Sequence, residues 1–183
     1  TLQEEVLLIK NKNQINQCKA LIIPGQGAFD PAIENLNKTD LIFNIKDWIK
    51  RGNHFLGICL GLQILFENSE EGFSEGLGLI KGKIKKIPYI EKEKIPHIGW
   101  CNLIQQKESK LIKSNLDNNW VYFDHSYYAS PTNEKIISAN VEYGSIYLTA
   151  IIEKDNLVAC QFHPEKSGKT GESILLKWLK TIN

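Results

Sequence analysis

Residues 54–61 decide the fold and read His-Phe-Leu-Gly-Ile-Cys-Leu-Gly. The apolar run 54–58 predicts a β-strand, and residues 60–67 predict a helix that begins directly at Cys59. Small residues two positions before and after Cys59 permit the tight strand-to-helix turn of a Gly-x-Ser-x-Gly elbow, with sulfur replacing oxygen. Taken alone, this pattern fits an exposed nucleophile and a buried structural cysteine about equally well.

Apolar runs upstream predict more of the same sheet. Residues 6–9 and 20–23 are candidate strands, and Pro24-Gly25 stops the second. Such continuous apolar strands are typical of a parallel sheet covered on both faces. Apolar positions at steps of three and four predict a helix over residues 41–51, with Gly52 as its C-cap. The alternation of strands and helices favours a doubly wound α/β fold.

The second half of the chain is richer in strands. We expect strands over residues 81–87, 120–128, 136–141, 145–152 and 157–162, then a closing helix over residues 172–181. The charge-rich residues 83–94 read as a solvated loop. The predicted fold class is therefore α/β, with a central mostly parallel sheet flanked by helices and an antiparallel, strand-rich second half. One domain is expected to span residues 1–183.

Composition restricts the classes of function. The chain has 183 residues, 42% hydrophobic and 23% charged, as in ordinary soluble globular proteins. A net charge of +1 predicts no nucleic-acid or membrane partner. Apolar runs fall short of the roughly 20 residues of a membrane span, and residues 1–9 do not read as a signal peptide. The cysteines lack CxxC spacing, so we expect no metal site and a reducing, cytoplasmic location; they are Cys18, Cys59, Cys101 and Cys160.

A second polar pair supplies the chemistry that Cys59 needs. His163-Pro164-Glu165 follows the predicted strand 157–162, and side chains two residues apart in an extended segment project to one side. A histidine can take the thiol proton, and a carboxylate can hold the imidazole tautomer. Cys59, His163 and Glu165 are therefore the candidate catalytic residues. The position of Cys59 at a helix N-terminus predicts a lowered thiol pKa, and the Leu60 N–H can point at a developing oxyanion.

A glycine turn follows the strand 20–23. Pro24-Gly25-Gln26-Gly27 can direct backbone N–H groups toward a site at the carboxyl edge of the sheet, where the Cys59 elbow must also lie. Without the other two motifs, it would read as an ordinary turn leading into a helix.

These motifs together resemble a known family. Pro24–Gly27, Gly57–Gln63 and Gln161–Ser167, in this order, resemble class I (triad) glutamine amidotransferases. Residues 96–100 and 122–128 narrow the resemblance to the glutaminase subunits of imidazole glycerol phosphate synthases. It implies hydrolysis of L-glutamine through a thioester, with no cofactor and no metal. It also implies a heterodimer with a (β/α)₈-barrel cyclase that uses the ammonia to form imidazole glycerol phosphate and AICAR in histidine biosynthesis.

The resemblance assigns roles that spacing alone does not. It implies that Gln63, Ser126 and Tyr127 bind glutamine, and that Gly25, Gln26 and Gly27 join Leu60 in the oxyanion hole. The subunit interface near the ammonia exit would include Pro96, Trp100, Tyr122 and Lys166. Without the family, Gln63 would read as a helix surface residue, and Trp100 and Tyr122 as core aromatics. His97 and His125 are not expected to be catalytic, because the triad is already complete.

The chain departs from the family pattern at three points. The family begins with a β-strand and a glycine–asparagine loop, and we expect this first strand to be missing, which would expose apolar faces and strand edges. Cys101 stands where asparagine usually follows Gly-Trp, and Asp124 replaces an apolar residue. Two alternatives therefore stay open: a paralogous glutaminase that supplies ammonia for an amidino sugar of a surface glycan, and a truncated inactive regulatory or scaffold protein.

Overall fold

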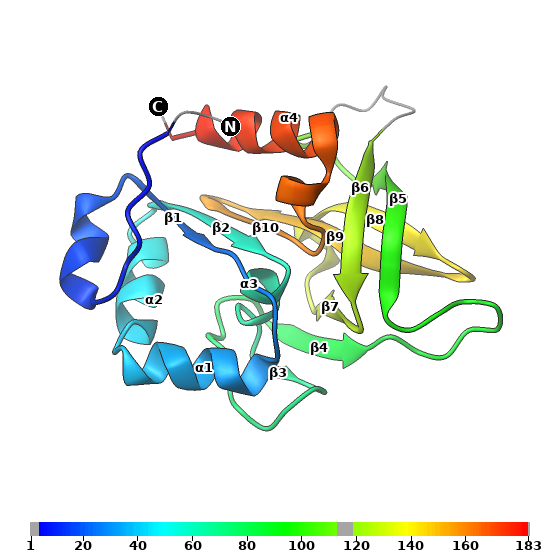
Figure 1. Cartoon of the computed structure of the whole chain (residues 1–183), viewed down its shortest axis with the longest axis horizontal. Coiled ribbons are helices and arrows are strands. Elements are labelled where there is room, and N and C mark those ends of the chain that lie inside the picture. The colour runs from blue at the N-terminus through cyan, green and yellow to red at the C-terminus, as the bar shows by residue number, and fades with distance from the viewer. Residues whose placement is uncertain (1–3, 113–118, 183) are drawn as a thin grey trace.

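The computed structural model describes residues 4–112 and 119–182, which form a twisted sheet with helices on both faces (Figure 1). Within these residues the larger sheet has seven strands. In spatial order they are β1 (Ala20–Ile23), β2 (His54–Ile58), β10 (Leu157–Cys160), β9 (Ile146–Lys154), β8 (Ile137–Tyr143), β5 (His97–Gln105) and β6 (Trp120–His125). The second sheet has the order β3 (Asn68–Ser69), β4 (Gly82–Lys86) and β7 (Tyr127–Pro131).

The larger sheet changes strand direction part-way across. β1 and β10 both pair in parallel with β2, whereas β10 pairs with β9 in antiparallel fashion, as do all the neighbours beyond it. The register places Ile23 beside Gly57 and Cys160 beside Ile58. The predicted combination of a parallel part and an antiparallel, strand-rich second half is confirmed, as is the α/β class.

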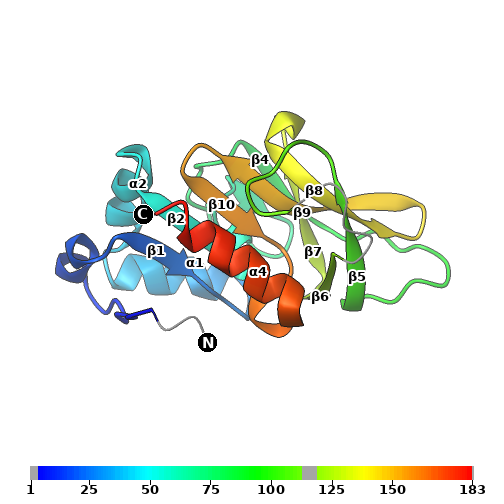
Figure 2. The ribbon, with the colours of Figure 1, turned by 90° about the horizontal axis from the view of Figure 1, so that it is seen from above.

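Helices cover both faces of the parallel strands. In Figure 1, α1 (Phe29–Lys38) and α2 (Ile42–Lys50) lie below the strands and α4 (Gly168–Leu179) lies above them; the view from above in Figure 2 has α4 nearest the viewer. Successive residues of β2 belong to two different cores, with Phe55 in the core of α1 and α2 and Leu56 in that of α4. Because both faces are buried, the strand sequence is continuously apolar rather than alternating.

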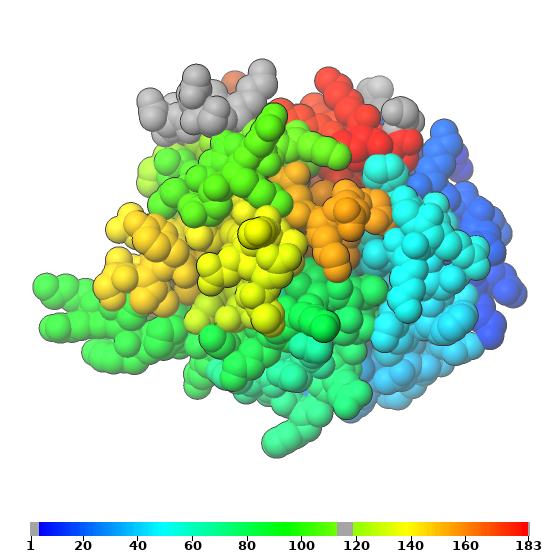
Figure 3. All heavy atoms as spheres, turned by 180° about the vertical axis from the view of Figure 1, so that it is seen from behind, coloured from blue at the N-terminus to red at the C-terminus, as the bar shows by residue number. Residues whose placement is uncertain are grey.

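The segment after β4 is a solvated loop, as predicted from its charge. It projects from the body of the molecule in Figure 1 and, seen from behind, in Figure 3. Tyr89 is largely exposed there. The first part of the predicted loop 83–94 instead belongs to β4, which lies within the strand predicted over residues 81–87.

The predicted strand 6–9 is wrong. These residues form no strand, and Val6 and Leu8 are exposed. A short apolar run becomes a strand only where a neighbouring strand satisfies its backbone N–H and C=O groups. The 3₁₀ helix η1 (Lys12–Gln17) follows this segment.

The predicted helix 60–67 is cut short: α3 spans only Leu60–Gln63. The carbonyl of Ile64 accepts from Leu77 N–H at 2.7 Å, and that of Leu65 accepts from Leu79 N–H at 2.9 Å. A later loop therefore takes the carbonyls beyond α3, which ends the helix after one turn.

The predicted strand 120–128 is two strands in two different sheets. β6 ends at His125 and β7 begins at Tyr127, with the Ser126 carbonyl accepting from Ile87 N–H at 2.9 Å. The predicted strands 20–23 and 54–58 occur with these bounds, and the other predicted helices and strands occur with shifted ends. Short 3₁₀ helices η2 (Glu134–Ile136) and η3 (Pro164–Lys166) complete the described elements. None of the helices in the described residues is long and apolar enough to span a bilayer.

Candidate active site

Cys59 stands at the apex of a strained elbow between β2 and α3. Its backbone has φ 52° and ψ −105°, a conformation that L-residues rarely adopt. A β-carbon on Gly57 would come within 2.6 Å of the Gly61 carbonyl oxygen, and one on Gly61 would overlap the carbonyl oxygen of Ile23. The glycines on either side of Cys59 are therefore required for the turn, as the sequence predicts.

The electrostatic environment of Cys59 differs from the prediction. Burial raises the pKa of its thiol to about 11, although hydrogen bonds from the Leu60 N–H and the Gln161 amide lower it in part. The predicted lowering by a helix N-terminus is wrong because α3 is only one turn long and the sulfur is desolvated. The resting group is therefore a neutral thiol that needs a base.

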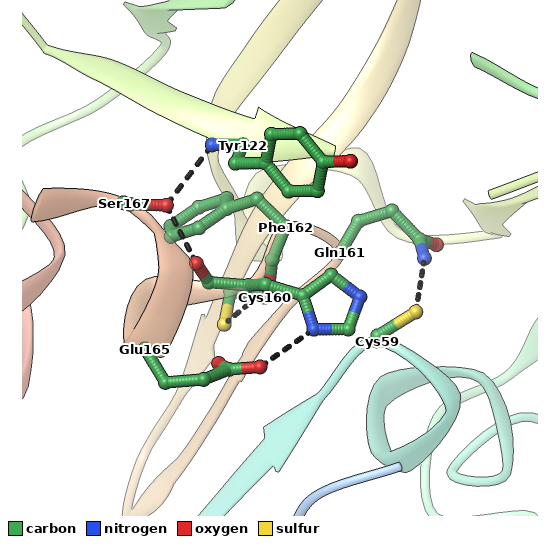
Figure 4. A network of polar contacts seen from close by, with 8 residues as sticks. Cys59, Tyr122, Cys160, Gln161, Phe162, Glu165 and Ser167 are labelled. Carbon is green, nitrogen blue, oxygen red and sulfur yellow. Dashed lines mark hydrogen bonds and ion pairs between the residues drawn. The ribbon is translucent and has the colours of Figure 1, made fainter. Parts of the chain in front are cut away.

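His163 and Glu165 form the hydrogen-bonded pair that the sequence predicts. The Nδ1 of His163 lies 2.8 Å from Glu165 Oε1, so Nδ1 carries a hydrogen and donates it to the carboxylate (Figure 4). The ring is almost fully buried, and its Nε2 has no hydrogen-bond partner within residues 4–112 and 119–182. In the neutral ring this buried Nε2 is an unoccupied proton acceptor.

Backbone bonds hold the histidine in place. The His163 N–H donates to the Tyr122 carbonyl at 2.9 Å, while the Ser167 hydroxyl donates to the His163 carbonyl at 2.6 Å and accepts from Tyr122 N–H. This ties η3 to β6 on the side where β10 ends (Figure 4).

The sheet brings these groups to one place. The Cys59 N–H donates to the Cys160 carbonyl at 2.8 Å, and the Gln161 amide reaches the Cys59 sulfur at 3.6 Å. The charge of Glu165 is near enough to raise the pKa of the Cys59 thiol, as is that of Asp124. The residue Asp124, which departs from the family pattern, therefore influences the nucleophile.

The glycine loop borders the elbow. A β-carbon on Gly25 would lie 3.1 Å from Leu60 Cβ, whereas Gln26 and Gly27 are exposed. Among the described residues, no group accepts a hydrogen bond from the N–H groups of residues 25–27. These donors are free for an incoming anion, and the Leu60 N–H already points at the sulfur.

Two of the three predicted glutamine-binding residues, Gln63 and Tyr127, are joined by a hydrogen bond, whereas the Ser126 carbonyl accepts from Ile87 N–H. Gln63 is only 5% exposed, so it is not a helix surface residue. Its Nε2 donates to the Tyr127 carbonyl at 3.1 Å and to Gln161 Oε1 at 3.3 Å. Because both amide hydrogens bind the protein, only the Gln63 Oε1 remains to contact a ligand.

Comparison with known proteins settles the family. The model of the class-I glutamine amidotransferases matches residues 2–181. The chain belongs to this family. The predicted resemblance is thereby confirmed.

Curated members of the family are close in sequence. The chain is 62% identical, over 182 residues, to the imidazole glycerol phosphate synthase subunit HisH of Prochlorococcus marinus subsp. pastoris (strain CCMP1986 / NIES-2087 / MED4), with 100% of this chain and 89% of that protein covered. It is 45% identical to the subunit of the same name from Synechococcus sp. (strain CC9902), over 100% of this chain and 85% of that protein.

Solved structures agree on the fold. A crystal structure of a glutamine amidotransferase superposes with a TM-score of 0.68 at 16% identity, over 95% of this chain and 84% of that one. The glutaminase domain of Trypanosoma brucei CTPS, with bound acivicin, gives a TM-score of 0.57 at 16% identity, over 92% of this chain and 74% of the other.

A cluster of partly exposed side chains adjoins the active site of this amidotransferase. The ring of Trp100 lies 6.1 Å from that of Tyr122, and Lys166 Nζ lies 5.8 Å from the Tyr122 centroid. Trp100 is 50% exposed and is not a core aromatic. Pro96 is exposed, follows a cis peptide bond and immediately precedes β5.

Sequence reasoning missed two features of this site. Gln161 was visible only as part of the family motif, and nothing in its spacing indicates that its amide faces Cys59. His97 and His125 are a buried pair with Nδ1 and Nε2 3.0 Å apart, and Cys101 lies 3.2 Å from the other nitrogen of His97. Within the described residues, no three His, Cys, Asp or Glu side chains form a group that could hold a metal ion.

Proposed function

We propose that the chain is the glutaminase subunit of an imidazole glycerol phosphate synthase, hydrolysing L-glutamine to glutamate and ammonia. The observation that carries this proposal is the buried Nε2 of His163, which has no partner among the residues that the structure describes. Glu165 holds the ring in the tautomer that accepts a proton, in a site whose elbow presents Cys59. The high identity to proteins named as HisH subunits supports the choice of pathway. We assign the whole chain to one glutaminase domain, in the cytoplasm.

The first half of the reaction forms a thioester. The buried thiol of Cys59 transfers its proton to His163 Nε2 as the sulfur attacks the carboxamide carbon of glutamine. The oxyanion is stabilised by the Leu60 N–H and by the N–H groups of residues 25–27. His163 then protonates the leaving nitrogen, and ammonia departs as the C–N bond breaks.

The second half regenerates the enzyme. A water gives a proton to His163 Nε2 and attacks the γ-glutamyl thioester, after which the proton returns to the departing Cys59 sulfur. Glu165 stabilises the imidazolium in both halves. We assign glutamine binding to the Gln63 Oε1 and to the backbone at Ser126 and Tyr127.

We propose further that a (β/α)₈-barrel cyclase docks over Trp100, Tyr122, Lys166 and Pro96 as the second half of a heterodimer. Exposed aromatic and basic side chains beside a reactive site are typical of binding surfaces. Ammonia released at Cys59 would pass there to the cyclase, which forms imidazole glycerol phosphate and AICAR. The complete set of Cys59, His163 and Glu165 argues against an inactive scaffold.

Substitution of the nucleophile tests the activity. Cys59→Ala should abolish glutamate release from glutamine in the presence of the barrel cyclase, while the two proteins still bind each other. Wild-type protein should react at Cys59 with a glutamine-analogue electrophile. Normal turnover by Cys59→Ala would refute the proposal.

A surface substitution tests the partner. Trp100→Ala should weaken binding to the barrel cyclase by about tenfold or more, measured by titration calorimetry. Phe43→Ala is a matched control, because Phe43 is an exposed aromatic on α2 at the opposite end of the sheet. Equal affinities of the two variants would exclude Trp100 from the interface.

A further inference from the structure

The sulfur of Cys59 has a side-chain hydrogen-bond donor outside the triad. Gln161 Nε2 lies 3.6 Å from Cys59 Sγ (Figure 4). Gln161 is completely buried, and its backbone N–H donates to the Ala150 carbonyl at 2.9 Å. The side chain is therefore held in the site rather than free to turn toward solvent.

Neighbouring residues decide which end of the Gln161 amide faces the sulfur. Gln63 Nε2 donates to Gln161 Oε1, so the Gln161 nitrogen must point the other way, at Cys59. Gln63 is in turn oriented by the Tyr127 carbonyl, which can only accept and so must receive an N–H.

The Tyr127 carbonyl is held from a second side. The Nδ1 of His125 lies 2.8 Å from it and must donate, which leaves His125 Nε2 to accept from His97 Nδ1 at 3.0 Å. Burial lowers the pKa of both histidines, so both rings are neutral near pH 7. The anchor that orients Gln63 and Gln161 therefore persists at neutral pH.

We propose that Gln161 is a catalytic residue that stabilises the Cys59 sulfur as it becomes a thiolate, and that Gln63 is the positioning residue that aims the Gln161 amide. The inference rests on the proposed role of Cys59 as nucleophile. When the thiol proton leaves, negative charge develops on a buried sulfur, and a hydrogen bond to a charged acceptor is roughly twice as strong as a neutral one. The Leu60 N–H turns from the sulfur to the oxyanion as the thioester forms, whereas the Gln161 amide stays with the sulfur.

The test measures alkylation of Cys59 by iodoacetamide, in which the thiolate displaces iodide. Peptide mass spectrometry separates Cys59 from the other three cysteines. Gln161→Met removes the donor at similar length and should slow alkylation at pH 8 by about tenfold. Gln63→Met should cause a smaller loss. Gln105→Met is the control, because Gln105 is an amide of β5 whose Nε2 donates to the Lys107 carbonyl, and it should react like wild type.

Gln161→Glu separates a donor from a merely structural side chain. At pH 8 the carboxylate should make Cys59 react more slowly than in Gln161→Met. As the pH falls and the buried carboxyl is protonated, it regains an O–H donor, so at pH 5.5 the Glu variant should react faster than the Met variant. If Gln161 only supported the structure, the order of the two variants' alkylation rates would be the same at pH 8 and pH 5.5.

Two outcomes would overturn the inference: wild-type alkylation in a folded Gln161→Met protein, or equal rates of the Glu and Met variants across the pH range. Circular dichroism shows whether the Met variant folds. If it does not, the alkylation rate of the nearly isosteric Glu variant is compared with that of wild type at the two pH values. A ratio of these rates that is the same at both pH values would overturn the inference. Because alkylation reports on the sulfur alone, wild-type protein that releases no glutamate would refute the proposed function and leave this result standing.

Discussion

Gly61 lies against the carbonyl oxygen of Ile23, with no space between them for a β-carbon. This contact joins the start of α3 to the end of β1, so the elbow that carries Cys59 docks on the strand that leads into the glycine loop 25–27. The nucleophile and the predicted oxyanion donors are thus positioned by one backbone contact.

Gly61→Ala should destabilise the protein by about 3 kcal/mol, because the added methyl group must displace main-chain atoms. Urea unfolding followed by circular dichroism measures the loss. Gly52→Ala is the control: Gly52 has φ +84° but open space around it, so only backbone strain of about 1 kcal/mol is expected. Equal losses at the two sites would show that the Ile23 contact is unimportant.

Glu165→Gln should lower kcat for glutamine hydrolysis by about a hundredfold and leave KM nearly unchanged. The amide oxygen can still accept from His163 Nδ1–H, but no charge remains to stabilise the imidazolium. The loss should be below the roughly 10⁴-fold known for a buried triad aspartate, since the Glu165 side chain is 50% exposed. Glu172→Gln, at an exposed position on α4, should behave like wild type; a Glu165→Gln enzyme of normal kcat would contradict the triad.

His125 should make the protein sensitive to acid. Burial lowers its pKa to about 3, against about 6.5 in the unfolded chain. A depressed pKa contributes stability that is present above pH 6.5 and is lost as the pH falls toward 3. Between pH 7 and pH 4 the loss from this group should be about 3 kcal/mol.

The variant His125→Asn tests this, since its amide can still donate to the Tyr127 carbonyl. Its free energy of unfolding, from urea titrations at pH 7 and pH 4, should fall less than that of wild type. Equal falls would show that His125 does not carry the acid sensitivity.

Asp30 should hold the segment that follows β3. Its carboxylate accepts from Phe73 N–H at 3.0 Å and from Ser74 N–H at 2.9 Å, and these bonds lower its pKa. The stabilisation is therefore present above the ordinary carboxyl pKa and is lost as the pH falls through the lowered value. Asp30→Asn should speed hydrogen exchange of residues 73 and 74 at pH 6, and the difference from wild type should shrink as the pH falls below the ordinary carboxyl range.

Asp47→Asn serves as the control for this measurement, because Asp47 of α2 forms an ion pair with Arg51, the C-cap of that helix, at the protein surface. It should leave the exchange of residues 73 and 74 unchanged. Unaltered exchange in Asp30→Asn would mean that the two hydrogen bonds do not restrain the loop.

Some elements could be predicted because neighbouring residues in the sequence are enough to specify them. The strands at 20–23 and 54–58 are apolar because helices bury both of their faces, and the glycines around Cys59 mark a turn that other residues cannot make. The pairing of His163 and Glu165 was predicted from an extended segment. In the structure Glu165 instead lies in the 3₁₀ helix η3, directly after His163, and its carboxylate reaches His163 Nδ1. The family motifs followed directly from these stretches.

Elements that depend on distant partners could not be predicted in this way. α3 ends after one turn because the N–H groups of residues 77–80 bind the carbonyls of residues 64–66. The predicted strand 120–128 is interrupted at Ser126 because the Ile87 N–H binds the Ser126 carbonyl. Residues 6–9 are as apolar as a strand but have no strand beside them within the described chain. Such bonds join segments whose proximity no local pattern records.

The sequence therefore determines which groups can react. The tertiary structure determines the protonation state of each group and the orientation of its side chain. Cys59 follows a strand in any reading of the sequence, yet only its burial makes it a neutral thiol instead of the thiolate that its position predicts. Gln161 is an ordinary amide until Gln63 turns its nitrogen toward the sulfur. Desolvation and amide orientation depend on every atom packed around a group, and those atoms come from segments far apart in the chain.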